Sequence, residues 1–202
     1  MKNQYFGDIH DYKKYGLLRA FAAASSLNIL VAWMLTPNDG RPDGNFTVYL
    51  GKEEHRVNDP ALYDWLQEHF GNDRPRSVTA IESSLLLPRS QYFADFVPDG
   101  AKDRATWFNR LMGAAQDQDL VFLDPDNGLL PNSCRPGRRN SSKYLFWCEV
   151  AELWKAGKSL LIYQHFPRKE RKKFIATCRN NLQNQANNAH IDAFRTSHVV
   201  FL

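Results

Sequence analysis

Short continuous runs of apolar residues alternate along the chain with longer stretches that repeat apolar residues at helical spacing. Residues 120–123 and 159–163 are mostly apolar, which is typical of strands that are covered on both faces. Residues 101–116 instead repeat large apolar side chains every three or four positions, as Trp107 and Leu111 do, and this spacing predicts a helix. The same criteria predict strands at 28–35, 46–50 and 78–81, one or two strands within 190–202, and helices at 9–25, at 59–70, from 141 or 142 to 156, and after Pro167.

Capping residues support several of these boundaries. Asp59 precedes Pro60, so a side-chain cap is followed by a proline whose missing N–H costs nothing in the first helical turn. Ser141 or Ser142 is a good start for the next-to-last helix, and Gly157 is a good end for it. These local signals fix where the helices should begin and end.

Strands and helices alternate, and several strands are apolar throughout. This pattern predicts an α/β fold, a Rossmann-like three-layer sandwich with a mainly parallel sheet, formed by residues 1–202 as a single domain. Ligands of such sheets bind outside the carboxyl ends of the strands. The candidate site residues therefore follow the predicted strands, at 36–44, Glu82, 124–128 and 164–168.

The segment DLVFLDPDNG is the sharpest of these candidates. An apolar strand delivers Asp124 and Asp126, and Pro125 stiffens the turn before Asn127 and Gly128. Two carboxylates held this close either bind a divalent metal or lie beside a cationic or amine-bearing ligand, because like charges without a partner raise one pKa. A plain turn with solvated aspartates uses the same residue types.

A second candidate is the strand end at Gln164 and His165, where a basic run follows. His165 is suited to proton transfer near neutral pH. Residues 135–179 hold twelve Lys or Arg and three Glu, a balance of +9 in a chain whose net charge is +4. Such a region suits an anionic partner such as nucleic acid, although lysines also simply solvate helix surfaces. The cations expected to bind nucleic acid are Arg138, Arg139, Lys143, Arg168, Lys169, Lys172 and Lys173.

Two further segments contribute polar groups. The N-terminal segment places acidic, basic and aromatic side chains ahead of the first helix, and we expect them to line a pocket together with Gln164: Asp8, His10, Asp11, Lys14 and Tyr15. The loop 36–44 follows the first strand, where Rossmann-like proteins hold a nucleotide. Its candidate cofactor-binding residues are Thr36, Pro37, Asp39 and Gly40, with Glu82 after a later strand.

Composition narrows the class of protein. Hydrophobic residues make up 43% of 202 residues, which is enough for a packed core. The three cysteines contain no CxxC pair, so we expect a reduced, cytoplasmic protein without a structural zinc site. The most apolar run, 27–35, is too short to cross a membrane, and residues 1–4 lack the apolar stretch of a signal peptide. Oligomeric state is not determined by the sequence.

Four motifs resemble a bacterial and phage-associated family that has no assigned activity. They are NQYFGDxxDYxKYGLLR, WMLTPxDGRxDG, DPDNG and YQHxPR, and they are spread over most of the chain. This resemblance implies no particular reaction.

The strand that ends in Asp124-Pro125-Asp126-Asn127 is also similar to the DPPY strand of class I S-adenosylmethionine-dependent methyltransferases, above all the ribosomal RNA adenine-N6 enzymes. This resemblance implies S-adenosylmethionine as cofactor, nucleic acid as substrate, and a terminal pair of strands. It implies that Asp124 accepts a hydrogen bond from the exocyclic amine of the target base. His165 and the basic run would face the nucleic acid.

Two other interpretations remain open. The order of Glu82, Asp124 and Asp126 resembles that of a Toprim domain, which implies a Mg²⁺-dependent nuclease or phosphotransferase. A non-catalytic module that binds nucleic acid or a protein through its basic face would need both aspartates to be structural.

Overall fold

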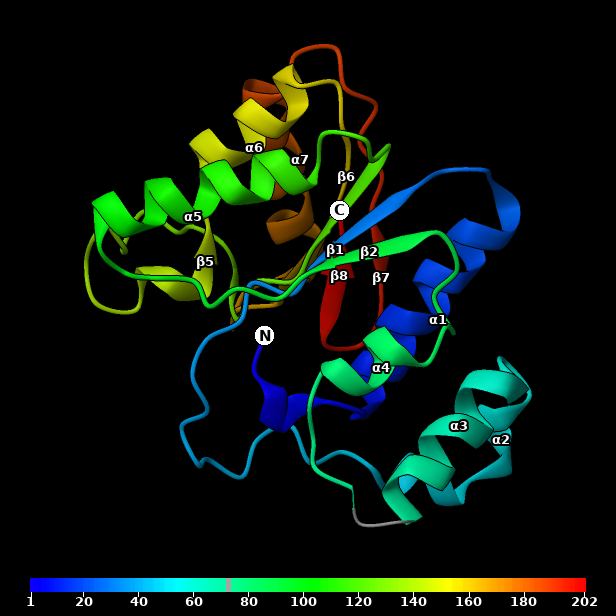
Figure 1. The fold of residues 1–202 in the computed structure, drawn as a ribbon. Helices are drawn as coiled ribbons and strands as arrows, with labels where there is room; N and C mark the ends of the chain where they lie inside the picture. The colour runs from blue at the N-terminus through cyan, green and yellow to red at the C-terminus, as the bar shows by residue number, and fades with distance from the viewer. Residues whose placement is uncertain (72–73) are drawn as a thin grey trace. The chain divides into compact units, whose positions relative to one another are not determined.

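The computed structural model describes residues 1–71 and 74–202 (Figure 1). The chain divides into two compact units, and each is described by itself. The sheet unit comprises Met1, Asn28–Thr36 and Gln91–Leu202. The helical unit comprises Lys2–Leu27 and Pro37–Ser90.

A six-stranded, mostly parallel sheet forms the centre of the sheet unit. Its strand order is β2-β1-β3-β6-β8-β7, in which β1 pairs parallel to β3 and β3 pairs parallel to β6. The strand β8 is antiparallel to both of its neighbours, β6 and β7. The strands are β1 (Ile29–Ala32), β2 (Ser90–Phe93), β3 (Leu120–Leu123), β6 (Ser159–His165), β7 (Phe194–Arg195) and β8 (Val199–Phe201). The α/β fold with a mainly parallel sheet is thereby confirmed.

Strand register brings three chain segments to one edge of this sheet. Ala32 is paired with Leu123, and Leu123 is paired with Ile162. The residues that follow these positions therefore lie toward the same carboxyl edge, where β6 continues to His165 beside β8. That edge holds the segments 33–36, 124–127 and 163–165.

Three helices cover one face of the sheet, α5 (Ala101–Ala114), α6 (Trp147–Lys155) and α7 (Arg171–Gln185), and Figure 1 shows them close together. Alternate strand residues point to this face because successive side chains of a strand point to opposite faces. The core they share includes Leu30, Ala32, Trp107, Leu111, Val121, Leu123, Val150, Leu153, Ile162, Cys178 and Leu182. The short strands β4 (Gly128–Leu129) and β5 (Tyr144–Leu145) pair parallel in a separate ladder, and a 3-10 helix (Ser141–Lys143) precedes β5.

The helical unit consists of α1 (Ile9–Ala24), α2 (Glu53–Arg56), α3 (Pro60–Gly71), α4 (Thr79–Ser83) and two 3-10 helices (Asn3–Tyr5 and Val48–Gly51). Aromatic rings pack at its centre, where Tyr49 lies 5.3 Å from Tyr12 and 6.4 Å from Tyr63 between ring centroids. Among the described residues of both units, no helix has the length and apolar character needed to cross a bilayer.

Two predicted strands are wrong. Residues 48–51 form a 3-10 helix instead, and 46–47 belong to no strand; the carbonyl of Leu50 accepts from Tyr63 Oη and Gln67 Nε2 rather than from a neighbouring strand. Residues 79–81 lie in α4 and Val78 is its N-cap; the Ser77 hydroxyl accepts from the N–H of Thr79 at the start of the helix.

Two other boundaries also differ from the prediction. The strand β2 was not expected from the sequence. The helix α6 begins at Trp147 rather than after Ser141 or Ser142, because the Glu149 carboxylate accepts from the N–H of Phe146 at 2.9 Å.

Candidate functional site

The aspartates of the DPDNG segment are buried at the carboxyl edge of the sheet. The N–H of Asp124 donates to the carbonyl of Ala32 at 3.0 Å, so the ladder between β1 and β3 continues past the end of β3. Asp124 and Asp126 are 1% and 8% exposed as residues. Their burial excludes the solvated turn that the sequence left open.

An ammonium group lies beside these aspartates. The N-terminal ammonium of Met1 donates to the carbonyls of Asp124 at 3.0 Å and Met34 at 3.2 Å, and lies 3.7 Å from Asp126 Oδ1. Thr36 completes the arrangement, because its N–H donates to the Met1 carbonyl at 2.8 Å and its hydroxyl lies 3.3 Å from Asp126 Oδ2. A cationic group of the chain itself thus lies beside the acidic pair. Thr36, Asp124 and Asp126 do come together, as predicted.

The turn after Asp126 is hydrogen-bonded to the end of β6 through Gln164. Gln164 is buried, its Oε1 accepts from the N–H of Leu129 at 2.7 Å, and its Nε2 donates to the carbonyl of Asn127 at 3.3 Å. Gly128 has a φ of +101°, and a Cβ there would lie 2.3 Å from Gln164 Oε1. Glycine is therefore required at this position, both by its backbone conformation and by the closeness of the amide.

A cleft of about 770 Å³, called the strand-tip cleft below, opens beside this turn. It lies at the end of β6, at the start of α7 and against the segments 127–133 and 144–147. Its walls are Asn127, Leu129, Leu130, Pro131, Asn132, Ser133, Tyr144, Trp147, Gln164, His165, Phe166, Pro167, Lys169, Glu170, Lys173, Phe174, Thr177, Cys178 and Asn181.

Five predicted site residues line the strand-tip cleft: Asn127, Gln164, His165, Lys169 and Lys173. The two aspartates do not line it, so the candidate segments 124–128 and 164–168 meet in this cleft only through Asn127, Gln164 and the residues from His165 to Pro167. The reason is burial, since the aspartate side chains are enclosed with Met1 while the chain emerges only at Asn127.

Aromatic rings make up much of the cleft wall and were not among the residues predicted for a site. Trp147 Nε1 donates to the carbonyl of Leu130 at 2.9 Å, which fixes the indole. Phe166 and Phe174 pack edge to face with centroids 6.0 Å apart, and the Arg171 guanidinium lies 5.4 Å from the Phe166 ring centroid. Hydrophobicity alone does not distinguish such rings from core residues; the one local signal is that Phe166 directly precedes Pro167 and the basic run.

Glu170 places a negative charge at the start of α7. Its carboxylate accepts from the N–H groups of Lys172 at 2.7 Å and Lys173 at 3.0 Å, so it caps the helix. A negative cap offsets the unfavourable interaction of the basic run with the positive end of the helix dipole. The exposed residues Lys169 and Lys173 still line the cleft, together with the exposed His165.

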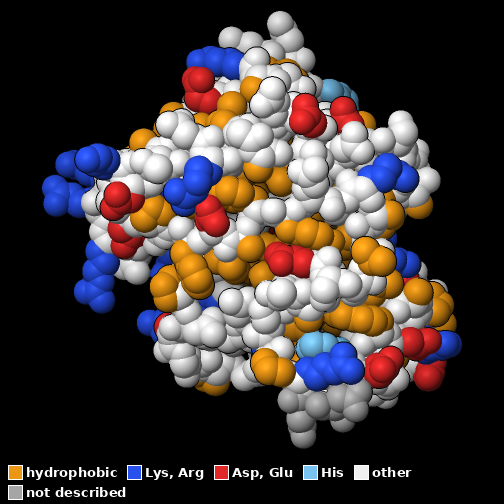
Figure 2. All heavy atoms as spheres, in the orientation of Figure 1, with side chains coloured by type: hydrophobic (Ala, Val, Ile, Leu, Met, Phe, Trp, Pro, Cys, Tyr) orange, Lys and Arg blue, Asp and Glu red, His pale blue; other side chains and the backbone are white. Residues whose placement is uncertain are grey.

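A basic loop between β4 and β5 carries the other predicted cations. Arg138 and Arg139 are exposed and Lys143 is half-buried. Figure 2 shows Lys and Arg side chains protruding on the side of this loop. Asp99 anchors the loop by accepting from the N–H groups of Asn140 at 2.9 Å and Ser142 at 2.7 Å. Burial opposes ionisation of Asp99, but these hydrogen bonds outweigh it and lower its pKa.

The N-terminal candidates form a buried network within the helical unit. Asp8 caps α1 by accepting from the N–H groups of His10 at 2.8 Å and Asp11 at 3.0 Å. Asp11 in turn accepts from Lys14 Nζ at 3.1 Å and from the Tyr15 hydroxyl at 3.0 Å. Burial, and then the neighbouring Asp11 carboxylate, raise the pKa of Asp8 to about 7. His10 is half-buried, so the group is mostly enclosed.

The remaining cofactor candidates also lie in the helical unit. Pro37, Asp39 and Gly40 are exposed. Asp39 accepts from Lys2 Nζ at 2.8 Å, and this contact, with others, lowers the pKa of Asp39 to about 2. Glu82 lies within α4 and not after a strand, so the strand-end position that the Toprim resemblance requires is absent. Across residues 1–71 and 74–202, no three His, Cys, Asp or Glu side chains group closely enough to hold a metal ion.

Comparison of the chain with protein-family models, with curated proteins and with solved structures finds no match in any of the three.

Proposed function

We propose that the chain binds single-stranded nucleic acid in the strand-tip cleft. The observation that carries the proposal is that one cleft combines the ammonium groups of Lys169 and Lys173 with the rings of Trp147, Phe166 and Phe174. Cations that follow a backbone, next to rings on which bases stack, are the usual means of binding single strands. The cleft volume of about 770 Å³ is within the range of pockets that bind small ligands, and so suits a nucleotide.

A single strand fits this chemistry better than a duplex. Bases within a duplex are paired and stacked, so they reach an aromatic wall only after they leave the helix. An unpaired base gains about 1–3 kcal/mol from each stacking contact. Asn127 and His165 add hydrogen-bonding groups at the cleft, and such groups bind the edges of unpaired bases.

Two double variants of the same basic run provide a matched test. Lys169→Gln with Lys173→Gln removes two charges that line the cleft, whereas Arg168→Gln with Lys172→Gln removes two charges that do not. Binding of a fluorescent single-stranded oligonucleotide is measured by anisotropy over a range of salt concentrations. The cleft variant is expected to bind at least tenfold more weakly, and its salt slope should be smaller by about 0.7 for each phosphate that it no longer neutralises.

Equal weakening by both double variants would show that only general charge matters, and the cleft would lose its role. Unchanged binding in both, or tighter binding of duplex than of single strand, would also overturn the proposal. Thermal denaturation of each variant checks that the fold is intact.

Methyl transfer from S-adenosylmethionine is the second candidate function, and two features support it. The terminal strand pair, with β8 antiparallel beside β6, agrees with the resemblance to class I methyltransferases. The carboxyl edge also offers the acceptors that an ammonium group needs, namely the carbonyls of Met34 and Asp124 and the Asp126 carboxylate. S-adenosylmethionine carries such an ammonium group, which would take the place of the Met1 ammonium so that Thr36, Asp124 and Asp126 hold its amino-acid end. Bound there, it would supply the electrophilic methyl group.

Thermal stabilisation by S-adenosylhomocysteine tests this second function, because a ligand of the folded state raises the unfolding temperature. Wild type and the exposed control Asp103→Asn are expected to be stabilised, and Asp126→Asn is expected to lose the effect. No stabilisation of wild type at high ligand concentration would remove methyl transfer. Oligonucleotide binding in the strand-tip cleft is tested by the separate anisotropy assay and does not depend on this result.

A further inference from the structure

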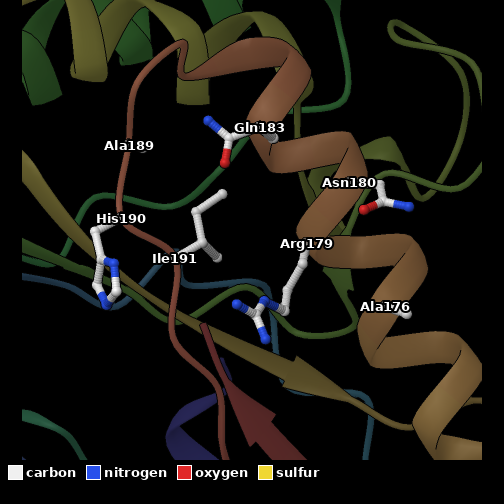
Figure 3. A pocket seen from close by; sticks show the side chains of 7 residues that line it. All are labelled: Ala176, Arg179, Asn180, Gln183, Ala189, His190 and Ile191. Atoms are coloured by element: carbon white, nitrogen blue, oxygen red, sulfur yellow. The ribbon is translucent and has the colours of Figure 1, made fainter.

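A second pocket, distinct from the strand-tip cleft, lies on the other flank of α7. It has a volume of about 390 Å³ and is formed by α7 and the segment 189–191 (Figure 3). Its walls are Ala176, Arg179, Asn180, Gln183, Ala189, His190 and Ile191. Figure 3 shows Arg179 and Gln183 extending from α7 toward the segment that holds His190 and Ile191.

Helix geometry separates the two pockets. Lys173, Thr177 and Asn181 recur every four residues and line the strand-tip cleft. Asn180 and Gln183 lie on a different face of the same helix and line the second pocket. The two pockets are therefore separate sites on different faces of α7.

Hydrogen-bond donors dominate the polar wall of the second pocket. Within the part of the chain that the structure describes, the Arg179 guanidinium and the Asn180 amide make no hydrogen bond or ion pair. The helix α7 contains Arg171, Lys172, Lys173 and Arg179 but no acidic residue, so no carboxylate lies one turn from Arg179.

The remaining polar side chains have local partners but can each form a further hydrogen bond. Gln183 Nε2 donates to the carbonyl of Ala186 at 3.3 Å, and one of its two amide hydrogens remains to donate. His190 Nε2 lies 3.0 Å from Asp192 Oδ2, which leaves its other ring nitrogen available. Ala176, Ala189 and Ile191 supply an apolar wall.

We propose that this second pocket binds a small oxyanion, a phosphate group carried by a small molecule. A guanidinium presents N–H donors in a planar fork that matches phosphate oxygens, and this geometry makes arginine a preferred phosphate ligand. The amides of Asn180 and Gln183 would add neutral donors. The apolar wall would contact the carbon part of a phosphate monoester.

Inorganic phosphate is the probe, titrated at constant ionic strength against the ¹⁵N-labelled chain and followed by NMR. We expect saturable shifts of the signals of Ala176, Arg179, Asn180, Gln183 and residues 189–191. Arg179→Gln is expected to weaken phosphate binding about tenfold or more, since it removes a charged hydrogen bond. Arg139→Gln, which removes the same charge from the basic loop, is expected to leave phosphate binding unchanged.

A single-stranded oligonucleotide without terminal phosphate distinguishes the two sources of phosphate. If the pocket serves small molecules, Arg179→Gln leaves oligonucleotide binding unchanged while phosphate binding falls. Shifts that are spread over all exposed cations, or an equal loss in Arg139→Gln, would overturn the proposal. So would displacement of phosphate from Arg179, Asn180 and Gln183 by the oligonucleotide, because the pocket would then be part of the nucleic-acid surface. The titration of wild type is independent of the strand-tip cleft and of its variants.

Discussion

The buried ion pair between α5 and α6 allows a quantitative prediction. Arg104 donates through Nε to Glu149 Oε1 at 2.6 Å and through Nη2 to Glu149 Oε2 at 2.7 Å, and both side chains are 4% exposed. The guanidinium lies between the rings of Trp107 and Phe146, at 4.5 and 4.4 Å from their centroids. Glu149 also accepts from the N–H of Phe146, so one carboxylate binds the cation and caps α6.

Glu149→Gln keeps the size of the side chain and removes its charge. Breaking a buried pair by neutralising one partner typically costs about 3–5 kcal/mol, because the remaining charge stays buried without compensation. Glutamine retains one acceptor oxygen, so we expect the lower end of this range, about 3 kcal/mol in the free energy of unfolding. In a chain of this size that corresponds to a fall of roughly 6–12 °C in Tm.

Thermal and urea denaturation followed by circular dichroism measure this loss. The exposed pair between Arg110 Nε and Asp95 Oδ2, at 2.9 Å, provides the matched control. Asp95→Asn is expected to cost less than about 1 kcal/mol, because exposed ion pairs contribute little. If Glu149→Gln were no more destabilising than Asp95→Asn, the reasoning about the buried pair would be refuted. The double variant Arg104→Met with Glu149→Met should recover part of the loss, since it leaves no buried charge.

Two further predictions concern the turn after β3 and the start of α1. Gly128→Ala should lower the free energy of unfolding by about 2–3 kcal/mol, because its Cβ would meet Gln164 and its φ is positive. Gly113→Ala is the control, since Gly113 faces open space within α5, and it should be neutral or stabilising in the same thermal denaturation. Equal effects of the two variants would contradict the steric explanation. The pKa of Asp8 is raised from 3.8 to about 7, so the folded state holds the Asp8 proton more tightly than the unfolded state does. The free energy of unfolding should therefore fall by up to about 4 kcal/mol as the pH rises from 4 through 7. Urea denaturation at pH 5 and 8 should show this decline in wild type but not in Asp8→Asn, whose amide oxygen still caps the helix. A parallel decline in both proteins would show that other titrating groups cause the pH dependence.

Much of the fold follows from local signals in the sequence. The strand at 120–123 was predicted at its observed bounds, because a run of four apolar residues between polar ones has few alternatives. The helix after Asp59 also begins at Pro60 and ends at Gly71, as its cap and its glycine indicate. The order of alternating elements then placed the DPDNG turn and Gln164 at one edge of a parallel sheet.

The chemistry at that edge was decided by contacts between distant parts of the chain. Whether Asp126 meets a metal, a ligand or solvent depends on Met1, which is 125 positions away in sequence but 3.7 Å away in space. Short segments were also ambiguous, and Tyr63 made the segment around Leu50 helical by binding its carbonyl. The aromatic wall of the strand-tip cleft was not predicted, since hydrophobicity alone does not distinguish a ring that packs inside from one that lines a cleft. Local sequence determines which backbone conformations are favourable, whereas tertiary packing determines which partner each polar group and each ring finally meets.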